Sequence, residues 1–436
     1  MGVVIRGPGS RPGPCCRPRY VPTVSAPFSI THARGSVDVR AAWTRAEVFA
    51  TIELLLSGWE SILPSSHDAR IVIKPNLNND LVALTGNCAD LRVIAALIEA
   101  LHRRGYTDLT VADGSNVGIE RRNISSFKRL RIDKLAARHG ARTVDLNRDE
   151  GRRIVLHAGA EPLVANTVLD ADFLISVPKI KTHAEAQLSC AMKNWVGICV
   201  GQDKRHMHHD LGRNIFALSE VVQPDLILVD GLVAMEGNGP GDGDPVRLGR
   251  LLMADDPFLN DVVAARLVGI DPRTVPYLRH ALDAGVVDDA LLSHVEREVA
   301  VVRPIQLAPP RSRLAELSES RHLSWLKTAV QPLVAKPAVA ELAYKAGIIQ
   351  DVYSLEDDTL RLVARAPDTC GDCRKCEDVC PTGLKLEDIG VKLELPDCVQ
   401  CLYCWWVCPK DALTLAGEAA SMQRQIDRYK GAIEGL

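Results

Sequence analysis

The chain of 436 residues is 47% hydrophobic and 25% charged, and its formal net charge at pH 7 is −3. This near-neutral balance gives no overall attraction to nucleic acid, and the sequence has no run of about 18 apolar residues that could span a membrane. We therefore predict a globular protein of more than one domain, with neither nucleic acid nor a membrane among its partners.

The N-terminal segment, residues 1–36, differs in composition from the rest of the chain. It is rich in Pro, Gly and Arg and contains no Asp or Glu. It also lacks the apolar core of a secretion signal, so we expect the protein to be cytoplasmic. We interpret residues 1–36 as a disordered tail.

Residues 37–310 alternate between short apolar runs, typical of buried strands, and longer segments with helical spacing. The predicted strands lie within residues 70–76, 108–115, 172–179, 224–231 and 247–255, and the predicted helices within 89–105, 125–140 and 256–271. Strands that alternate with helices of this length indicate an α/β domain with a mostly parallel sheet covered by helices.

The C-terminal part begins after a Pro-rich break near residues 301–314. Residues 311–366 have a helical pattern interrupted by Pro332 and Pro337, and we expect them to form a connecting arm. A small ferredoxin-like module at residues 367–416 and a C-terminal helix at 417–436 complete the predicted organisation.

Two matching strings contain eight of the thirteen cysteines, and each reads C-x2-C-x2-C-x3-C-P. Disulfides are rare in the cytosol, and zinc sites usually combine two short pairs of ligands. The spacing is instead that of bacterial two-cluster ferredoxins, in which the fourth cysteine of each string binds the other cluster. We therefore predict two [4Fe–4S] clusters. One is assigned to Cys370, Cys373, Cys376 and Cys408, and the other to Cys398, Cys401, Cys404 and Cys380.

A basic segment follows the predicted strand at residues 172–179. Lys179, Lys181 and His183 come directly after it, and Lys193 interrupts a later apolar stretch. Functional groups collect at the carboxyl ends of strands in α/β sheets. We predict an anion site in which Lys181, Lys193 and His183 are catalytic, with His183 as the proton donor. A solvated basic face, or lysines paired with buried acids such as Asp113 or Asp230, is the structural alternative.

Polar residues at the other predicted strand ends complete the candidate site. The substrate-binding set is Lys74, Asn76, Asp113, Lys179, Asn194, Asp230 and Glu236. The glycines that follow Glu236 do not match a dinucleotide-binding fingerprint. His206, His208 and His209 leave metal binding open as a weaker alternative, because imidazole suits zinc or iron.

Several motifs together resemble the domain-of-unknown-function family numbered 362. They are "IVIKPNL", "VADGS", "LISVPKIKTH", "AMKNWVGI", "VDGLVAMEGNGP" and "DPFLNDVVAARLVGID", between Arg70 and Asp271. The resemblance implies that a two-cluster ferredoxin module can follow the domain, but it implies no reaction. Phe258 and Leu259 depart from the pattern of similar proteins, which affects only the packing at one helix start.

The leading functional hypothesis is an iron–sulfur oxidoreductase that passes low-potential electrons to a small anionic substrate in the α/β domain. An external ferredoxin or flavoprotein would be the electron donor or acceptor. Two alternatives remain open at this point: an electron-transfer protein that docks a partner enzyme, and a cluster-bearing regulatory or assembly factor without turnover.

Overall fold

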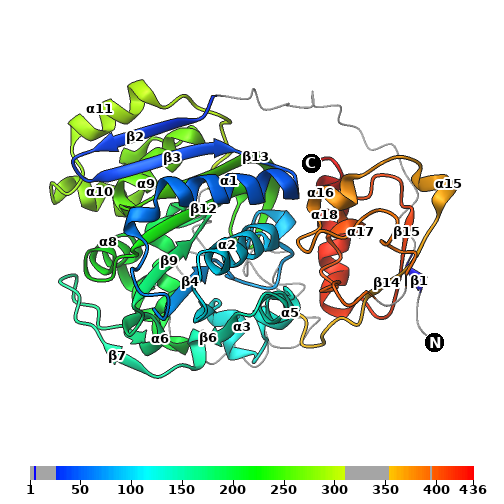
Figure 1. The fold of residues 1–436 in the computed structure, drawn as a ribbon. Helices are drawn as coiled ribbons and strands as arrows, with labels where there is room; N and C mark the ends of the chain where they lie inside the picture. The colour runs from blue at the N-terminus through cyan, green and yellow to red at the C-terminus, as the bar shows by residue number, and fades with distance from the viewer. Residues whose placement is uncertain (1–3, 6–25, 310–352, 393–394) are drawn as a thin grey trace.

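The computed structural model describes residues 4–5, 26–309, 353–392 and 395–436 (Figure 1). Its main sheet has the strand order β2-β3-β13-β12-β9-β4-β5-β6. The strands from β12 to β6 pair in parallel, as the alternation of strands and helices predicts. These strands are β4 (Ile71–Pro75), β5 (Leu109–Asp113), β6 (Arg142–Asp145), β9 (Phe173–Val177) and β12 (Leu226–Asn238).

The other side of the sheet is antiparallel, which the sequence did not predict. β12 turns through a hairpin into β13 (Asp242–Ala254), so the predicted glycine-rich loop is the tip of this hairpin. β13 then pairs with β3 (Gly35–Ala41), and β3 pairs with β2 (Phe28–His32). The predicted tail is therefore wrong for residues 28–36, because pairing between β2 and β3 holds them in the sheet. Residues 1–3 and 6–25 lie outside the described residues.

Helices cover both faces of the sheet. Alternate strand residues face opposite sides, so Ile71 and Ile73 belong to one buried cluster and Val72 to the other. The first cluster packs the sheet against α1 (Arg45–Gly58), α2 (Leu91–Arg103) and α5 (Ile132–Arg138). The second packs it against α8 (Leu211–Val221), α9 (Pro257–Leu267), α10 (Pro276–Asp283) and α11 (Asp289–Glu298).

Most predicted elements of the α/β domain are present, with one break. The helix expected within residues 125–140 is divided into α4 (Ser126–Arg129) and α5, because Arg131 has a left-handed backbone with φ of 62°. The smaller elements are α3 (Val117–Arg121), α6 (Asn166–Leu169), α7 (Ala191–Asn194), β7 (Gly151–Arg153), β8 (Leu163–Ala165), β10 (Lys179–His183) and β11 (Gln187–Ser189).

The C-terminal part lies beside the α/β domain, against α1, α2 and α5 (Figure 1). Its three-stranded sheet has the order β1-β15-β14, with β1 at Val4–Ile5, β14 at Arg361–Arg365 and β15 at Leu413–Ala416. The helices are α15 (Pro367–Cys370), α16 (Lys375–Val379), α17 (Tyr403–Trp406) and α18 (Gln423–Glu434). The predicted helical arm is wrong at β14, where pairing with β15 forms a strand, and its residues 311–352 lie outside the described residues.

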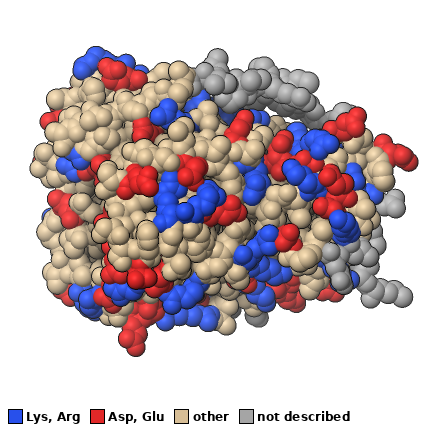
Figure 2. Space-filling model, viewed as in Figure 1, with Lys and Arg blue, Asp and Glu red and all other residues tan. Residues whose placement is uncertain are grey.

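Ion pairs join the two parts of the molecule. Arg138 contacts Asp397 at 2.5 Å, and Arg428 of α18 contacts Asp244 of β13 at 2.8 Å. Basic and acidic side chains are interspersed on the face shown in Figure 2, with no large area of one sign. Among the described helices, none is long and apolar enough to cross a membrane.

Candidate functional site

The predicted basic segment forms a strand rather than a loop. Residues 179–183 are β10, which pairs in parallel with β12 and antiparallel with β11. Lys179 and Lys181 lie two residues apart and are both buried. The two lysines therefore project into the protein at the carboxyl end of the parallel strands, where burial of a charge requires partners.

Lys179 has such a partner. Its Nζ lies 2.7 Å from Oδ2 of Asp230, and both side chains have an exposed fraction of 0%. The same Oδ2 accepts a hydrogen bond from the backbone N–H of Asp90 at 2.6 Å. Asp90 also caps α2 and pairs with Arg92 at 2.8 Å, fully buried. These residues form a buried network of two ion pairs, which the backbone N–H of Asp90 joins.

Lys74 and Asp113 form a second buried pair, at 2.6 Å. Lys74 Nζ also donates to Oδ1 of Asn194 at 2.9 Å, and Asn76 Nδ2 donates to the same oxygen at 3.2 Å. Gly197 packs directly on this pair, since a Cβ there would lie 2.5 Å from Oδ1 of Asp113. The structure thus brings together four residues that the sequence analysis placed in one site.

Lys181 has only neutral partners. Its Nζ donates to Oδ1 of Asn76 at 2.8 Å and to the backbone carbonyl of Asn87 at 2.7 Å. Burial lowers the pKa of Lys181 to about 7. Lys204, which donates to the Ser115 carbonyl at 2.9 Å, likewise has its pKa lowered to about 8 by burial. Among the described residues, neither of these two buried lysines has the carboxylate partner that Lys74 and Lys179 have.

Lys193 differs from the buried lysines. It is half-buried on α7 and makes no hydrogen bond or ion pair with any other residue that the structure describes. Its pKa is lowered to about 8, first by burial, and Lys74 lowers it further while Glu185 opposes the shift. Lys193 is therefore a cation at the rim of the buried network that is available to an anion.

His183 and Glu236 lie at the edges of this arrangement. Nδ1 of His183 accepts the backbone N–H groups of Glu185 and Ala186 at 3.1 and 3.2 Å. These two bonds keep Nδ1 free of a proton and leave Nε2 to carry it. Glu236, in the β12 hairpin, accepts the backbone N–H of Gln306 at 3.0 Å and makes no ion pair with a lysine that the structure describes. Of the predicted site residues, Glu236 and Lys193 make no hydrogen bond or ion pair with the described members of the network.

The three histidines of the weaker metal alternative lie on the 3₁₀ segment Gly201–Asp210 and are exposed. His206 faces Asp203 at 3.7 Å, whereas His208 faces Glu185 at 3.1 Å. Within the described ranges, no three His, Cys, Asp or Glu side chains are arranged to hold a single metal ion.

Sequence reasoning did not identify Asp90, Asn87 or Asp261. The carboxylate of Asp261, on α9, accepts the backbone N–H groups of Ala191 and Met192 at 2.8 and 3.1 Å, and so fixes the start of the helix that carries Lys193. Burial raises the pKa of Asp261 to about 6. The capping pattern of Asp90 before an apolar helix was readable, but its bond to Asp230 depends on residues 140 positions apart.

The cysteine strings surround two hollows in the C-terminal part. Cys380, Cys398, Cys401 and Cys404 line one hollow, with a volume of about 400 Å³. Cys370, Cys373, Cys376 and Cys408 line the other, which is much smaller at about 20 Å³. Each hollow takes three cysteines from one string and the last cysteine of the other. The assignment of these two groups of cysteines to clusters stays a prediction.

Local backbone geometry and nearby cations accompany these hollows. Gly371, Gln400 and Leu402, which lie between cysteines, have φ values of 54°, 58° and 61°, so the strings wrap tightly. Arg365 Nη1 approaches Cys370 Sγ at 3.7 Å, and Lys410 Nζ donates to the Cys370 carbonyl at 2.8 Å. Burial raises the pKa of the Cys376 thiol to about 12. A group that binds thiolates here must therefore supply positive charge itself.

Comparison with known proteins gives an assignment for the α/β part. Residues 71–266 match the model of a family described as a domain of unknown function, DUF362. These residues form a DUF362 domain. The match confirms the predicted resemblance and includes every lysine of the buried network, whereas both cysteine strings lie outside it.

One curated relative of this chain is the thylakoid-associated protein sll1697 of Synechocystis sp., 30% identical over 225 residues. The match covers 48% of this chain and 65% of the relative, so the chain spans less than two thirds of that protein. A solved structure, the lactate racemase apoprotein from Thermoanaerobacterium thermosaccharolyticum, gives a TM-score of 0.28 at 8% identity, covering 53% of this chain and 59% of the other. A likeness at this level supports no conclusion.

Proposed function

We propose that this DUF362 protein is an iron–sulfur redox protein that binds two [4Fe–4S] clusters and a small anion. The observation that carries the proposal is the division of eight cysteines between two hollows, three from one string and one from the other in each. A single ion draws its ligands to one point, whereas each cysteine of a [4Fe–4S] cluster binds its own iron atom. The division of the cysteines between the hollows supports the second kind of ligand set, because their spacing is that of two-cluster ferredoxins.

The residues around the hollows suit such clusters. When bound, clusters of this type supply one-electron transfer, often at low potential. The chain's own part is to hold them and to balance their negative charge. Arg365 and Lys410 lie beside the smaller hollow, and the buried Lys430 donates to the Cys408 carbonyl at 3.2 Å. Beside the larger one, the Leu384 N–H donates to Cys380 Sγ at 3.3 Å, which favours the thiolate.

The metal content of protein purified without oxygen tests this part of the proposal. We expect about eight irons and eight acid-labile sulfides per chain. Cys380→Ser should damage the cluster that Cys398, Cys401 and Cys404 hold, although Cys380 belongs to the other string. Cys199→Ala, at a buried cysteine outside the strings, is the matched control and should keep full iron content. Stoichiometric zinc without a cluster spectrum would overturn the assignment.

For the α/β domain we propose a binding site for a small anion at Lys193, close enough to Lys181 for the charge of Lys193 to lower the pKa of Lys181 further. Lys193 supports this because it is half-buried and makes no ion pair among the described residues. An anion bound there would form charge-assisted hydrogen bonds and offset the repulsion between lysines. Lys74 and Lys179, already paired with Asp113 and Asp230, form the framework of the site rather than its ligands.

A cytoplasmic oxidoreductase that reduces this anion, with a ferredoxin or flavoprotein as external electron donor, is the activity that we propose. One observation favours an electron-transfer protein that docks a partner enzyme instead: two of the predicted substrate-binding lysines are closed off by buried carboxylates. The kinetics of reoxidation separate the two. Reduction within one chain gives a rate independent of protein concentration, whereas delivery to a partner gives a second-order rate.

A further inference from the structure

One buried segment, residues 76–90, contacts both the lysine network and the cysteine-rich part. It connects β4 to α2, and its only helical turn is the 3₁₀ turn Ala83–Thr85. Buried backbone groups without regular structure must find other partners. We call residues 76–90 the linking segment, because its partners come from both parts of the molecule.

On the side of the lysines, both ends of the linking segment are anchored. Lys181 Nζ donates to the side chain of Asn76 at 2.8 Å and to the backbone carbonyl of Asn87 at 2.7 Å. The backbone N–H of Asp90 donates at 2.6 Å to the carboxylate oxygen that pairs with Lys179. A change in the charge or position of Lys181 therefore acts directly on two points of the segment.

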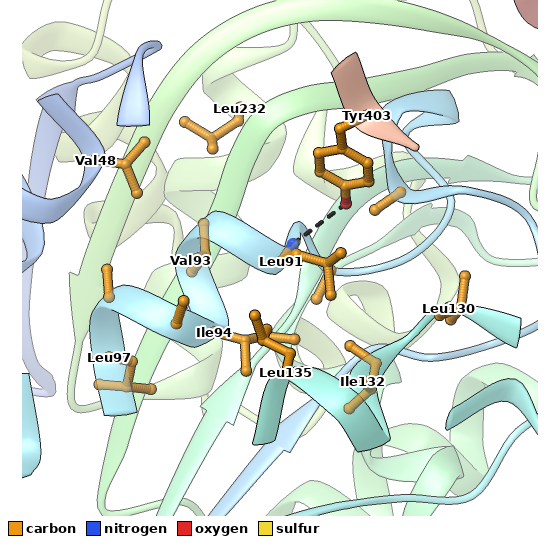
Figure 3. Close-up of a cluster of buried hydrophobic side chains, with 14 of the residues drawn as sticks. Val48, Leu91, Val93, Ile94, Leu97, Leu130, Ile132, Leu135, Leu232 and Tyr403 are labelled. Carbon is orange, nitrogen blue, oxygen red and sulfur yellow. Dashed lines mark hydrogen bonds between the residues drawn. The ribbon is translucent and has the colours of Figure 1, made fainter. Parts of the chain in front are cut away.

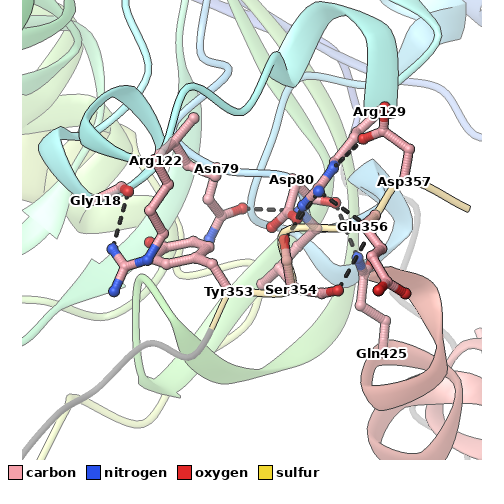
Figure 4. Close-up of polar contacts among 12 residues, drawn as sticks. Asn79, Asp80, Gly118, Arg122, Arg129, Tyr353, Ser354, Glu356, Asp357 and Gln425 are labelled. Atoms are coloured by element: carbon pink, nitrogen blue, oxygen red, sulfur yellow. Dashed lines mark hydrogen bonds and ion pairs between the residues drawn. The ribbon is translucent and has the colours of Figure 1, made fainter. Parts of the chain in front are cut away.

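On the other side, the middle of the segment is bonded to α18. Oε1 of Gln425 accepts the Val82 N–H at 2.9 Å, and its Nε2 donates to the Asp80 carbonyl at 3.0 Å. Gln425 is buried. Figure 4 shows Gln425 and Arg129 near Asp80 of the linking segment. Asp80 is held further by Arg129 at 2.6 Å. Both polar atoms of the Gln425 amide, Oε1 and Nε2, therefore bond the segment to α18.

At its C-terminal end, the segment meets the second cysteine string. The backbone N–H of Leu91 donates to the Tyr403 hydroxyl at 3.3 Å, a bond drawn in Figure 3. Tyr403 lies between Cys401 and Cys404 in the chain and lines the larger hollow with them. Tyr403 and Cys401 also line a small hollow with Asp80, Ala89 and Leu91, so the cysteine loop and the segment are direct neighbours.

We propose that the linking segment couples the anion site to the group held by Cys380, Cys398, Cys401 and Cys404, so that anion binding and the oxidation state of that group influence each other. The inference rests on the proposed function. Its physical basis is that Lys181 is hydrogen-bonded to Asn76 and Asn87 of the segment, whereas Tyr403 is hydrogen-bonded to the backbone of Leu91, the residue that follows the segment. Coupling of this kind is reciprocal, because each event changes the equilibrium of the other by the same factor.

The test uses the full-length, cluster-loaded protein and inorganic phosphate as the probe. We expect the phosphate Kd of the wild type to differ between the oxidised and dithionite-reduced forms by about fivefold or more. The cluster midpoint potential, followed by electron paramagnetic resonance, should shift with phosphate by the matching amount, about 59 mV for each tenfold change in Kd for one electron. Neither readout depends on turnover.

Two variants cut the segment from the C-terminal part without changing charge. Gln425→Ala removes the contact with Val82 and Asp80, and Tyr403→Phe removes only the hydroxyl that accepts from Leu91. Each should reduce the difference in Kd to less than about twofold while iron content and phosphate binding by the oxidised protein remain. Gln423→Ala, at an exposed residue of α18, is the control and should keep the wild-type difference.

The possible failures can be told apart. Phosphate binding with equal Kd in both forms would overturn the coupling and leave the anion site intact. An undiminished difference in both variants would show that charge acts through space, and would overturn the role of the linking segment. Absence of phosphate binding would remove the anion site and the inference with it, and iron content would still decide the cluster assignment. If Gln425→Ala fails to fold, Tyr403→Phe alone decides.

Discussion

At the scale of single residues, the lysines of the candidate site fall into three environments. Lys179 has a buried carboxylate partner, Lys181 has only neutral oxygen partners, and Lys193 has no ion pair with a described residue. Burial of a charge costs several kcal/mol unless it is paired, so the three environments carry different energies. Residues of the same type, within fifteen positions of one another, should therefore respond differently to substitution.

The first prediction compares Lys179 with Lys193. Lys179→Ala leaves Asp230 as an unpaired buried carboxylate and should lower the free energy of unfolding by about 3–5 kcal/mol. Lys193→Ala breaks no ion pair and should stay within about 0.5 kcal/mol of the wild type, while phosphate binding is lost. Urea unfolding and calorimetric titration measure the two effects. Wild-type phosphate affinity in Lys193→Ala would contradict the proposed site.

The second prediction concerns pH. Lysine titrates near 10.4 in an unfolded chain, whereas burial lowers the pKa of Lys181 to about 7. Between these values the unfolded chain binds a proton that the folded protein lacks. The free energy of unfolding should therefore rise with pH above 7, by up to about 1.4 kcal/mol per unit from this residue, and stay flat below 7.

Lys181→Met should remove this contribution. As the pH rises from 7 to 9, the free energy of unfolding of the wild type should therefore increase relative to that of the variant. Lys385→Met, at an exposed lysine, should retain the wild-type slope. Urea midpoints at pH 7, 8 and 9 give the comparison. Parallel curves for the wild type and Lys181→Met would mean that Lys181 keeps its proton throughout this range.

At the scale of elements, the linking segment holds its shape through close packing on β12. Gly86 has φ of +79°, and a Cβ there would lie 2.3 Å from the backbone oxygen of Ala234. That oxygen belongs to the central hairpin and cannot move away as a flexible side chain would. Gly159, in the β7–β8 connection, has a similar φ of +86° but open space around it.

The third prediction uses these two glycines as a matched pair. Gly159→Ala should cost only the left-handed backbone energy, roughly 1–2 kcal/mol. Gly86→Ala adds a clash with backbone and should cost at least about 3 kcal/mol in unfolding free energy. Chemical unfolding of both variants measures the difference. Equal costs would show that the segment shifts freely away from β12, which would also weaken its role as a coupling element.

At the scale of the whole molecule, the two parts share one hydrophobic core. A single buried cluster contains Ile94 and Leu97 of α2 together with Trp405, Trp406 and Leu415 of the C-terminal part. Figure 3 shows Tyr403 entering this cluster above Leu91. Because unfolding of either part would expose the shared surface, the α/β domain and the cysteine-rich part should stabilise each other.

The fourth prediction follows from this shared core. Loss of helix, measured by far-ultraviolet circular dichroism, and loss of cluster absorbance should occur together in one transition during anaerobic heating. Separate α/β and ferredoxin modules on a loose tether would give two midpoints. Loss of the cluster signal well before the helices melt would therefore contradict the shared core as the main source of cooperativity.

Local sequence patterns were enough for most of the regular elements of the α/β domain. The apolar runs of β4, β5 and β9, the helical spacing of α2 and the Pro-led start of α9 are short-range signals, and the structure has these elements. The C-x2-C-x2-C-x3-C spacing places three cysteines on one loop and predicts that the fourth cysteine of each group comes from the other string, an assignment to clusters that stays a prediction. The two hollows have this composition.

Tertiary structure decided the rest, because it depends on partners far apart in the chain. Residues 28–32 look like a tail until β3 and β13 supply strand partners. Lys179 looks like a ligand for a substrate until Asp230, 51 positions away, is placed 2.7 Å from its Nζ. The sequence shows which side chains carry charge, but only folding determines which charged groups lie next to one another. A buried lysine that pairs with a carboxylate belongs to the framework of the site. A buried lysine without such a pair can bind an anion.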